Sequence, residues 1–174
     1  MKEYVINSGR SDLSLYNLIS GSQLPEQIII GVVAHDAYNG SMNKNPFNFK
    51  HFGIKEASII VNGVNEPAEL YKLDVDDGDK VDMFANFIEN TGVHMDNREF
   101  GISLNDYYGG SFLLAWDRTP DKCNRYHRHK MDSGTIDVNI KTKQVLTETV
   151  TVIVYATYSS DIIIQDRKVH VQNF

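Results

Sequence analysis

Apolar and polar residues alternate with a period of two along much of the chain. In residues 135–141, Ile136, Val138 and Ile140 alternate with polar residues, and residues 149–156 repeat the pattern with valines. Because successive side chains of a β-strand point to opposite faces, each segment is predicted to be a strand with one buried and one solvated face. Such strands are typical of antiparallel sheets.

Short runs rich in β-branched residues predict further strands. The expected strands are residues 3–7, 27–33, 57–61, 68–73, 111–117, 135–141, 149–158, 161–165 and 168–171. Pairs of residues that tolerate a positive φ lie between them. Asn62-Gly63, just before Val64, is the clearest predicted hairpin, and Asn39-Gly40 is a further predicted turn.

Helical periodicity is local. In residues 79–91, apolar residues recur at the spacing of one helix face, at Val81, Phe84, Ala85 and Ile88. Asp79 and Gly92 are suitable caps for this helix, Ser103 for one further turn, and Thr119 with Pro120 for another. Many strands, few helices and no β-α-β rhythm predict an all-β sandwich or barrel, not a nucleotide-binding α/β fold.

Length and composition indicate one ordinary globular domain, residues 1–174, without a linker or repeat. The net charge of −6 argues against direct binding of nucleic acid. The one basic stretch, residues 122–130, is interpreted as a solvated loop or a subunit contact. A single cysteine, Cys123, excludes an internal disulfide and indicates a reducing compartment. We expect neither a membrane span nor a secretory leader, because no apolar run is long enough.

Three residues are weak candidates for a metal site. Cys123, His127 and His129 form a C-x3-H-x-H cluster. A helix would bring Cys123 and His127 to one face, and a strand would bring the two histidines together. A fourth ligand at a usual spacing is missing, so we expect no metal and no cofactor.

Two other motifs resemble functional sites but lack residues that those sites require. Residues 74–79 resemble the start of a calcium-binding EF-hand loop, but Ala85 stands where the bidentate glutamate belongs, and an acidic turn before a helix explains them better. His35-Asp36 with Ser41 or Ser22 would need a nucleophile elbow that neither serine has. We therefore predict no catalytic residues and no enzymatic activity.

The aromatic residues allow two interpretations. Phe47, Phe49 and Phe52 either pin a loop onto the core or form an exposed patch that contacts a neighbouring subunit. The single tryptophan, Trp116, is expected inside the sandwich with its indole N–H hydrogen-bonded nearby.

Several blocks of the sequence resemble, in order, the C-terminal half of a viral capsid protein family. They are residues 24–33, 36–40, 45–49, 61–63, 110–121, 133–136 and 152–158, and the most specific is Asn45-Pro46-Phe47-Asn48-Phe49. The family is the double jelly-roll major capsid proteins of Polinton/Maverick elements and adintoviruses, with domesticated relatives in animal genomes.

This resemblance implies an eight-stranded jelly-roll sandwich with one or two short helices in loop insertions. It also implies a structural role: self-assembly, as a trimer or hexamer, into capsomers of a virion shell. Asn39 and Gly40 would form a turn, Pro46, Phe47 and Phe49 a loop anchor, and Asn62 and Gly63 a hairpin.

The sequence departs from the family in one respect, since only one roll is present. The chain is either an excised domain that follows another roll or a free-standing roll. The alternative function is a host-adapted module, located in the cytoplasm or nucleus, that recognises a protein, peptide or glycan through its rim loops.

Overall fold

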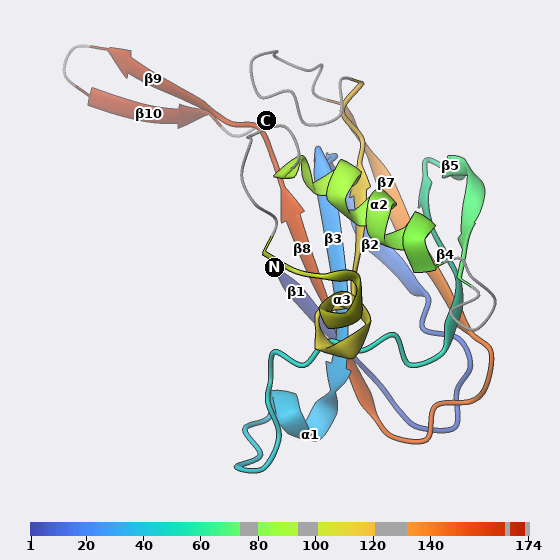
Figure 1. The fold of residues 1–174 in the computed structure, drawn as a ribbon. Helices are drawn as coiled ribbons and strands as arrows, with labels where there is room; N and C mark the ends of the chain where they lie inside the picture. The colour runs from blue at the N-terminus through green and yellow to red at the C-terminus, as the bar shows by residue number, and fades with distance from the viewer. Residues whose placement is uncertain (74–79, 94–100, 121–131, 166–167, 173–174) are drawn as a thin grey trace.

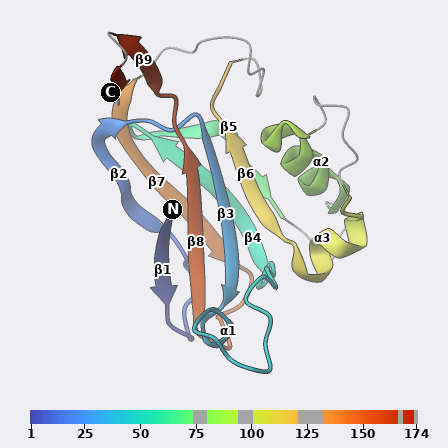
Figure 2. The ribbon, with the colours of Figure 1, turned by 90° about the vertical axis from the view of Figure 1, so that its left-hand side faces the viewer.

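The computed structural model describes residues 1–73, 80–93, 101–120, 132–165 and 168–172. Two four-stranded antiparallel sheets face each other and form the body of the molecule (Figure 1; Figure 2). The first sheet has the order β1 (Lys2–Ile6), β8 (Val150–Thr157), β3 (Gln27–Ala34), β6 (Leu113–Asp117). The second has the order β2 (Leu15–Gln23), β7 (Ser133–Thr142), β4 (Ile54–Val61), β5 (Val64–Lys72).

The strand pairs show how the chain is wound. β1 pairs with β8, β2 with β7, β3 with β6 and β4 with β5. Each pair joins strands equally distant from the two ends of the series, and successive pairs alternate between the sheets. This is the topology of a jelly roll, in which one long hairpin is rolled into two sheets. The predicted all-β sandwich is confirmed.

The expected number of strands was eight, and the described residues hold ten. Eight of them make the sandwich, and the other two, β9 (Asp161–Gln165) and β10 (Lys168–Gln172), pair only with each other in a separate two-stranded sheet. Both segments were predicted as strands, but nothing in their local pattern separates a strand of the sandwich from one of an outlying hairpin.

The core follows the alternation seen in the sequence. Val150, Val152 and Val154 of β8 are at most 3% exposed, as are Ile136, Val138 and Ile140 of β7. They share one hydrophobic cluster with the inward residues of β3, Ile28, Ile30 and Val32. The two strands that alternate most regularly therefore contribute one buried face each to the space between the sheets.

Of the three helices in the described residues, two match predicted segments. α2 (Lys80–Thr91) and α3 (Leu104–Gly110) lie beside β6, at one edge of the first sheet (Figure 2). Ser103 caps α3 in a capping box with Asp106. The short α1 (His35–Tyr38), which follows β3 directly, was not predicted. Thr119 and Pro120 begin no helix within the described residues, and Asp121 lies outside them.

Candidate interaction surfaces

Two predicted turns lie at opposite ends of the sandwich. Asn39 follows α1 and donates its backbone N–H to the carbonyl of His35 at 3.0 Å, and Gly40 has φ +95°. Asn62 and Gly63, with φ of +50° and +83°, form the two-residue connection between the paired residues Val61 and Val64. Two consecutive positive φ values match the twist of the flanking strands.

The aromatic segment after α1 is divided between anchoring and exposure. Phe49 donates its backbone N–H to the carbonyl of Gly110 at 2.8 Å and accepts the N–H of Phe112 at 3.1 Å. Phe52, partly buried, packs against the core. Phe47, by contrast, is 75% exposed. Phe49 and Phe52 therefore fasten the loop, and Phe47 is available to a neighbour.

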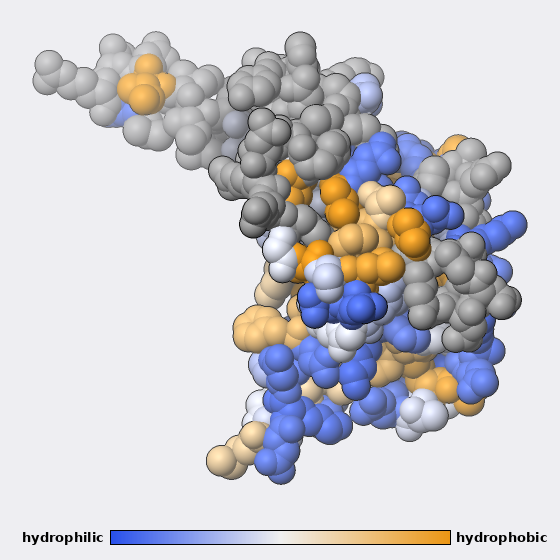
Figure 3. All heavy atoms as spheres, in the orientation of Figure 1, coloured by the Kyte–Doolittle hydropathy of each residue, from blue (hydrophilic) through white to orange (hydrophobic). Residues whose placement is uncertain are grey.

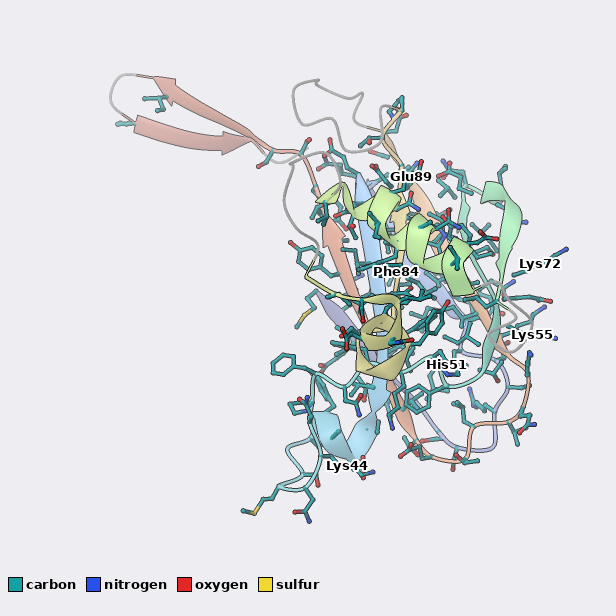
Figure 4. The ribbon with its side chains drawn as sticks, in the orientation of Figure 1. Lys44, His51, Lys55, Lys72, Phe84 and Glu89 are labelled. Carbon is teal, nitrogen blue, oxygen red and sulfur yellow. The ribbon has the colours of Figure 1, made fainter. Side chains whose placement is uncertain are left out.

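Polar contacts hold the rest of this loop in place. The side-chain oxygen of Asn45 accepts the backbone N–H of Phe47 at 2.9 Å, which shapes the turn around Pro46. Lys44 forms an ion pair with Asp36 at 2.6 Å, and the hydrogen bond from Lys44 lowers the pKa of the Asp36 carboxyl. Figure 4 shows Lys44 beside α1 and His51 close to α3. The exposed Phe47 thus lies on a loop with a defined backbone.

The outer face of the first sheet carries apolar residues. Register places Tyr155 of β8 beside Ile29 of β3, on the face opposite the core valines. Tyr155 is 49% exposed, Ile29 is half-buried, and Val5 of β1 is 55% exposed. Exposed apolar groups that cluster on one face are typical of contact surfaces.

A groove adjoins this face at the edge of the sandwich. Its volume is about 520 Å³, and it is lined by Gln23 of β2 and residues 155–160. The pairing of β1 with β8 runs from Ile6↔Val150 to Lys2↔Val154, so residues 155–157 of β8 extend beyond their partner strand. An edge that continues past its partner can accept a further strand.

A second apolar region lies over α2. Val81 is 61% exposed, and Phe84 and Ile88 are partly exposed. In Figure 3, apolar residues gather at the centre of the face that carries α2, above the hydrophilic lower rim. On its other side α2 packs through Phe87, whose ring stacks on Tyr107 of α3 with 5.3 Å between the centroids.

A cavity of about 250 Å³ lies between α2 and the ends of β5 and β6. Tyr71 stacks on Trp116 in its wall, and burial raises the pKa of the Tyr71 hydroxyl. Arg118 forms an ion pair with Glu66 at 2.9 Å. Trp116 is inside the sandwich, as predicted. Its indole N–H has no hydrogen-bond partner among the described residues, so the prediction of a nearby partner is wrong.

The residues considered for catalysis serve structural contacts. His35 makes ring-nitrogen hydrogen bonds with Thr151 at 2.9 Å and Asn39 at 2.8 Å, whereas Asp36 pairs with Lys44. The histidine and its neighbouring carboxylate are therefore engaged with different partners, and Asp36 does not orient the imidazole.

The candidate metal ligands Cys123, His127 and His129 lie outside the described residues, as does the acidic segment 74–79. Within the described part of the chain, no three His, Cys, Asp or Glu side chains are grouped as a metal site would require. Among the described helices, none is long and apolar enough to cross a membrane.

Comparison with known proteins supports the fold. No family model matches the sequence. The chain is 30% identical over 97 residues to the uncharacterized protein F54H12.2 of Caenorhabditis elegans, a match that covers 56% of this chain and 23% of the relative. Its fold is similar to that of a chain in the 3.5 Å cryo-EM structure of the Sputnik virophage, with a TM-score of 0.54 and 9% identity. That match covers 99% of this chain and 37% of the virophage chain, so the likeness of fold extends over nearly all of this chain and over about a third of the other.

Proposed function

We propose that the chain is a virus-like capsid module that builds a shell by packing against copies of itself. The observation that carries the proposal is the jelly roll formed by β1 to β8, in a chain whose fold is similar to that of a virophage chain. Jelly rolls occur in capsid and lectin proteins alike, so the fold alone does not choose between these functions, and the proposal also draws on the exposed surfaces.

The lengths support a module within a larger protein. The virophage match covers 37% of that chain, and the 97 matched residues cover 23% of the nematode relative. In the capsid proteins of Polinton/Maverick elements and adintoviruses that the sequence resembles, two rolls are fused. We propose that this chain is equivalent to the second roll, that a preceding roll completes it, and that it is located in a virion.

The surfaces are suited to contacts between copies. Phe47 is 75% exposed on a fastened loop, and Val5 and Tyr155 are exposed on the outer sheet face. Aromatic side chains contribute much of the binding energy of interfaces because they bury a large area at a small entropic cost. Six single rolls in a ring, or three fused pairs of rolls, would give a hexagonal outline.

Light scattering coupled to size exclusion, followed by negative-stain electron microscopy, tests the proposal. We expect ring-shaped particles with the mass of a trimer or a hexamer. A single species with the mass of one chain at high micromolar concentration would refute self-assembly, and specific binding of that monomer in a glycan array would support the rim-loop recognition module in its place.

A further inference from the structure

The hairpin of β9 and β10 stands apart from the sandwich. The two strands pair with each other, from Gln165↔Lys168 to Asp161↔Gln172. Figure 1 shows the ribbon extending away from both sheets after β8 ends. A two-stranded hairpin is marginally stable in water unless something packs on it. This hairpin would therefore be stabilised by a surface that packs on it.

The register gives the hairpin two unlike faces. Ile164 is paired with Val169 and Ile162 with Val171, so these four apolar residues occupy positions on one face. The positions of the other face hold Asp161, Ile163, Gln165, Lys168, His170 and Gln172. Ile164 is 74% exposed. A ribbon with one β-branched face is patterned to cover another apolar surface.

A suitable surface exists on the same chain. The groove of about 520 Å³ lies beside the last residues of β8, next to the half-exposed Tyr155. Residues 155–157 extend past the end of β1, so the edge of β8 can accept additional backbone pairing there. The groove thus combines an apolar side chain with an open strand edge.

We propose that the β9–β10 hairpin is an arm that docks in this groove on a second copy of the chain. This inference rests on the proposed function, and it identifies the arm and the groove as the contact between assembling copies. The groove lining includes residues 158–160, which directly precede β9. The base of each arm therefore lies beside the groove of its own copy.

The occupant is a second copy because one chain carries both halves of the contact. The arm points away from its own sheets, so it reaches a neighbour without refolding. Each copy gives one arm and receives one, and an exchange of this kind closes into a ring when the rotation between copies allows it. That result agrees with the trimer or hexamer expected of a capsomer.

Sedimentation velocity on the full chain and two matched variants tests the arm. Ile164→Lys places a charge on the apolar face of the hairpin. Val145→Lys makes the same change at a residue that is 58% exposed in the connection before β8, at the end of that strand away from the groove. We expect Ile164→Lys to weaken association by roughly tenfold or more, and Val145→Lys to sediment like the unaltered chain.

The outcomes separate the arm from the proposed function. If the unaltered chain assembles and Ile164→Lys assembles equally well, the proposed docking of the arm is wrong, and the proposed self-assembly is unaffected. If the unaltered chain is a monomer, both are wrong. Circular dichroism checks that Ile164→Lys remains folded, which is expected because the hairpin lies outside the sandwich.

Cross-linking between differently tagged chains identifies the receiving surface. One chain carries Ile164→Cys and the other Tyr155→Cys, both with Cys123→Ser, and a short bifunctional maleimide is added. We expect a dimer that contains both tags. Replacing Tyr155→Cys by Val145→Cys should abolish it. Equal cross-linking at both positions would overturn the assignment of the groove.

Discussion

Phe49 lies so close to Gly31 that the backbone of β3 has no room there for a side chain. A Cβ atom on Gly31 would come 2.7 Å from Cδ1 of the Phe49 ring and 2.7 Å from Cδ2 of Leu113. The ring of a residue in the loop after α1 therefore rests directly on the outer face of the first sheet. This contact fixes the loop that presents Phe47.

Gly31→Ala should therefore destabilise the fold. Overpacking of this kind costs about 1–3 kcal/mol, because the ring and the leucine must both move. Chemical denaturation gives the free energy of unfolding. If Gly31→Ala were as stable as the unaltered chain, the contact between Phe49 and Gly31 would not constrain the loop.

Substitutions at Phe47 and Phe49 should affect self-association and stability differently. Phe47→Ala removes a side chain that is 75% exposed, so we expect unchanged denaturation and weaker self-association. Phe49→Ala removes the loop anchor, and we expect a lower free energy of unfolding. Parallel denaturation and sedimentation on both variants check this, and equal stability losses would contradict the division of roles.

The hairpin turn gives a matched pair of glycine substitutions. Gly63→Ala should cost about 1–2 kcal/mol, because its φ of +83° is strained for a residue with a Cβ. Gly109→Ala is the control, since a Cβ there meets no atom within 4 Å and alanine favours its helix. The midpoint temperature of thermal unfolding should therefore fall for Gly63→Ala and stay unchanged or rise for Gly109→Ala.

The buried Tyr107 should make the stability of the fold depend on pH in alkaline solution. Its side chain is fully buried and donates its hydroxyl proton to the carbonyl of Leu113 at 2.6 Å. Burial, and then the charge of Tyr108, raise the pKa of Tyr107 above the ordinary tyrosine value of 10.0. The unfolded chain therefore loses this proton first, and the free energy of unfolding should fall as the pH rises above 10.

The matching variant is Tyr107→Phe. It should reduce the decline above pH 10, by up to about 1.4 kcal/mol per pH unit, and leave a smaller one, because burial also raises the pKa of Tyr71. Denaturation at neutral and alkaline pH measures both slopes. Identical slopes for the variant and the unaltered chain would show that Tyr107 does not titrate on unfolding.

The strands with regular alternation could be predicted from the sequence, and β2 could not. In β7 every second residue from Ile136 on is buried, and in β8 the three alternating valines Val150, Val152 and Val154 are buried, which is the pattern that alternation describes. In β2, Asn17 and Gly21 have positive φ, and the pairing with β7 shifts register twice. Bulges break the period of two, so the strand leaves no alternation to detect.

The candidate site was predictable only in part, because exposure depends on tertiary packing. The sequence placed Phe47, Phe49 and Phe52 together but could not show which ring would face solvent. That choice is set by Gly31, whose missing side chain admits Phe49. The separation of β9 and β10 from the sandwich was likewise absent from the pattern, since an apolar run such as that of β9 and an alternation such as that of β10 are also typical of strands inside a sandwich.

Self-assembly into a ring is the claim on which the account depends, and sedimentation equilibrium over a wide range of concentrations measures it most directly. The account predicts that the mass rises with concentration to a plateau at three or six chains. A mass that stays at one chain up to high micromolar concentration would contradict it.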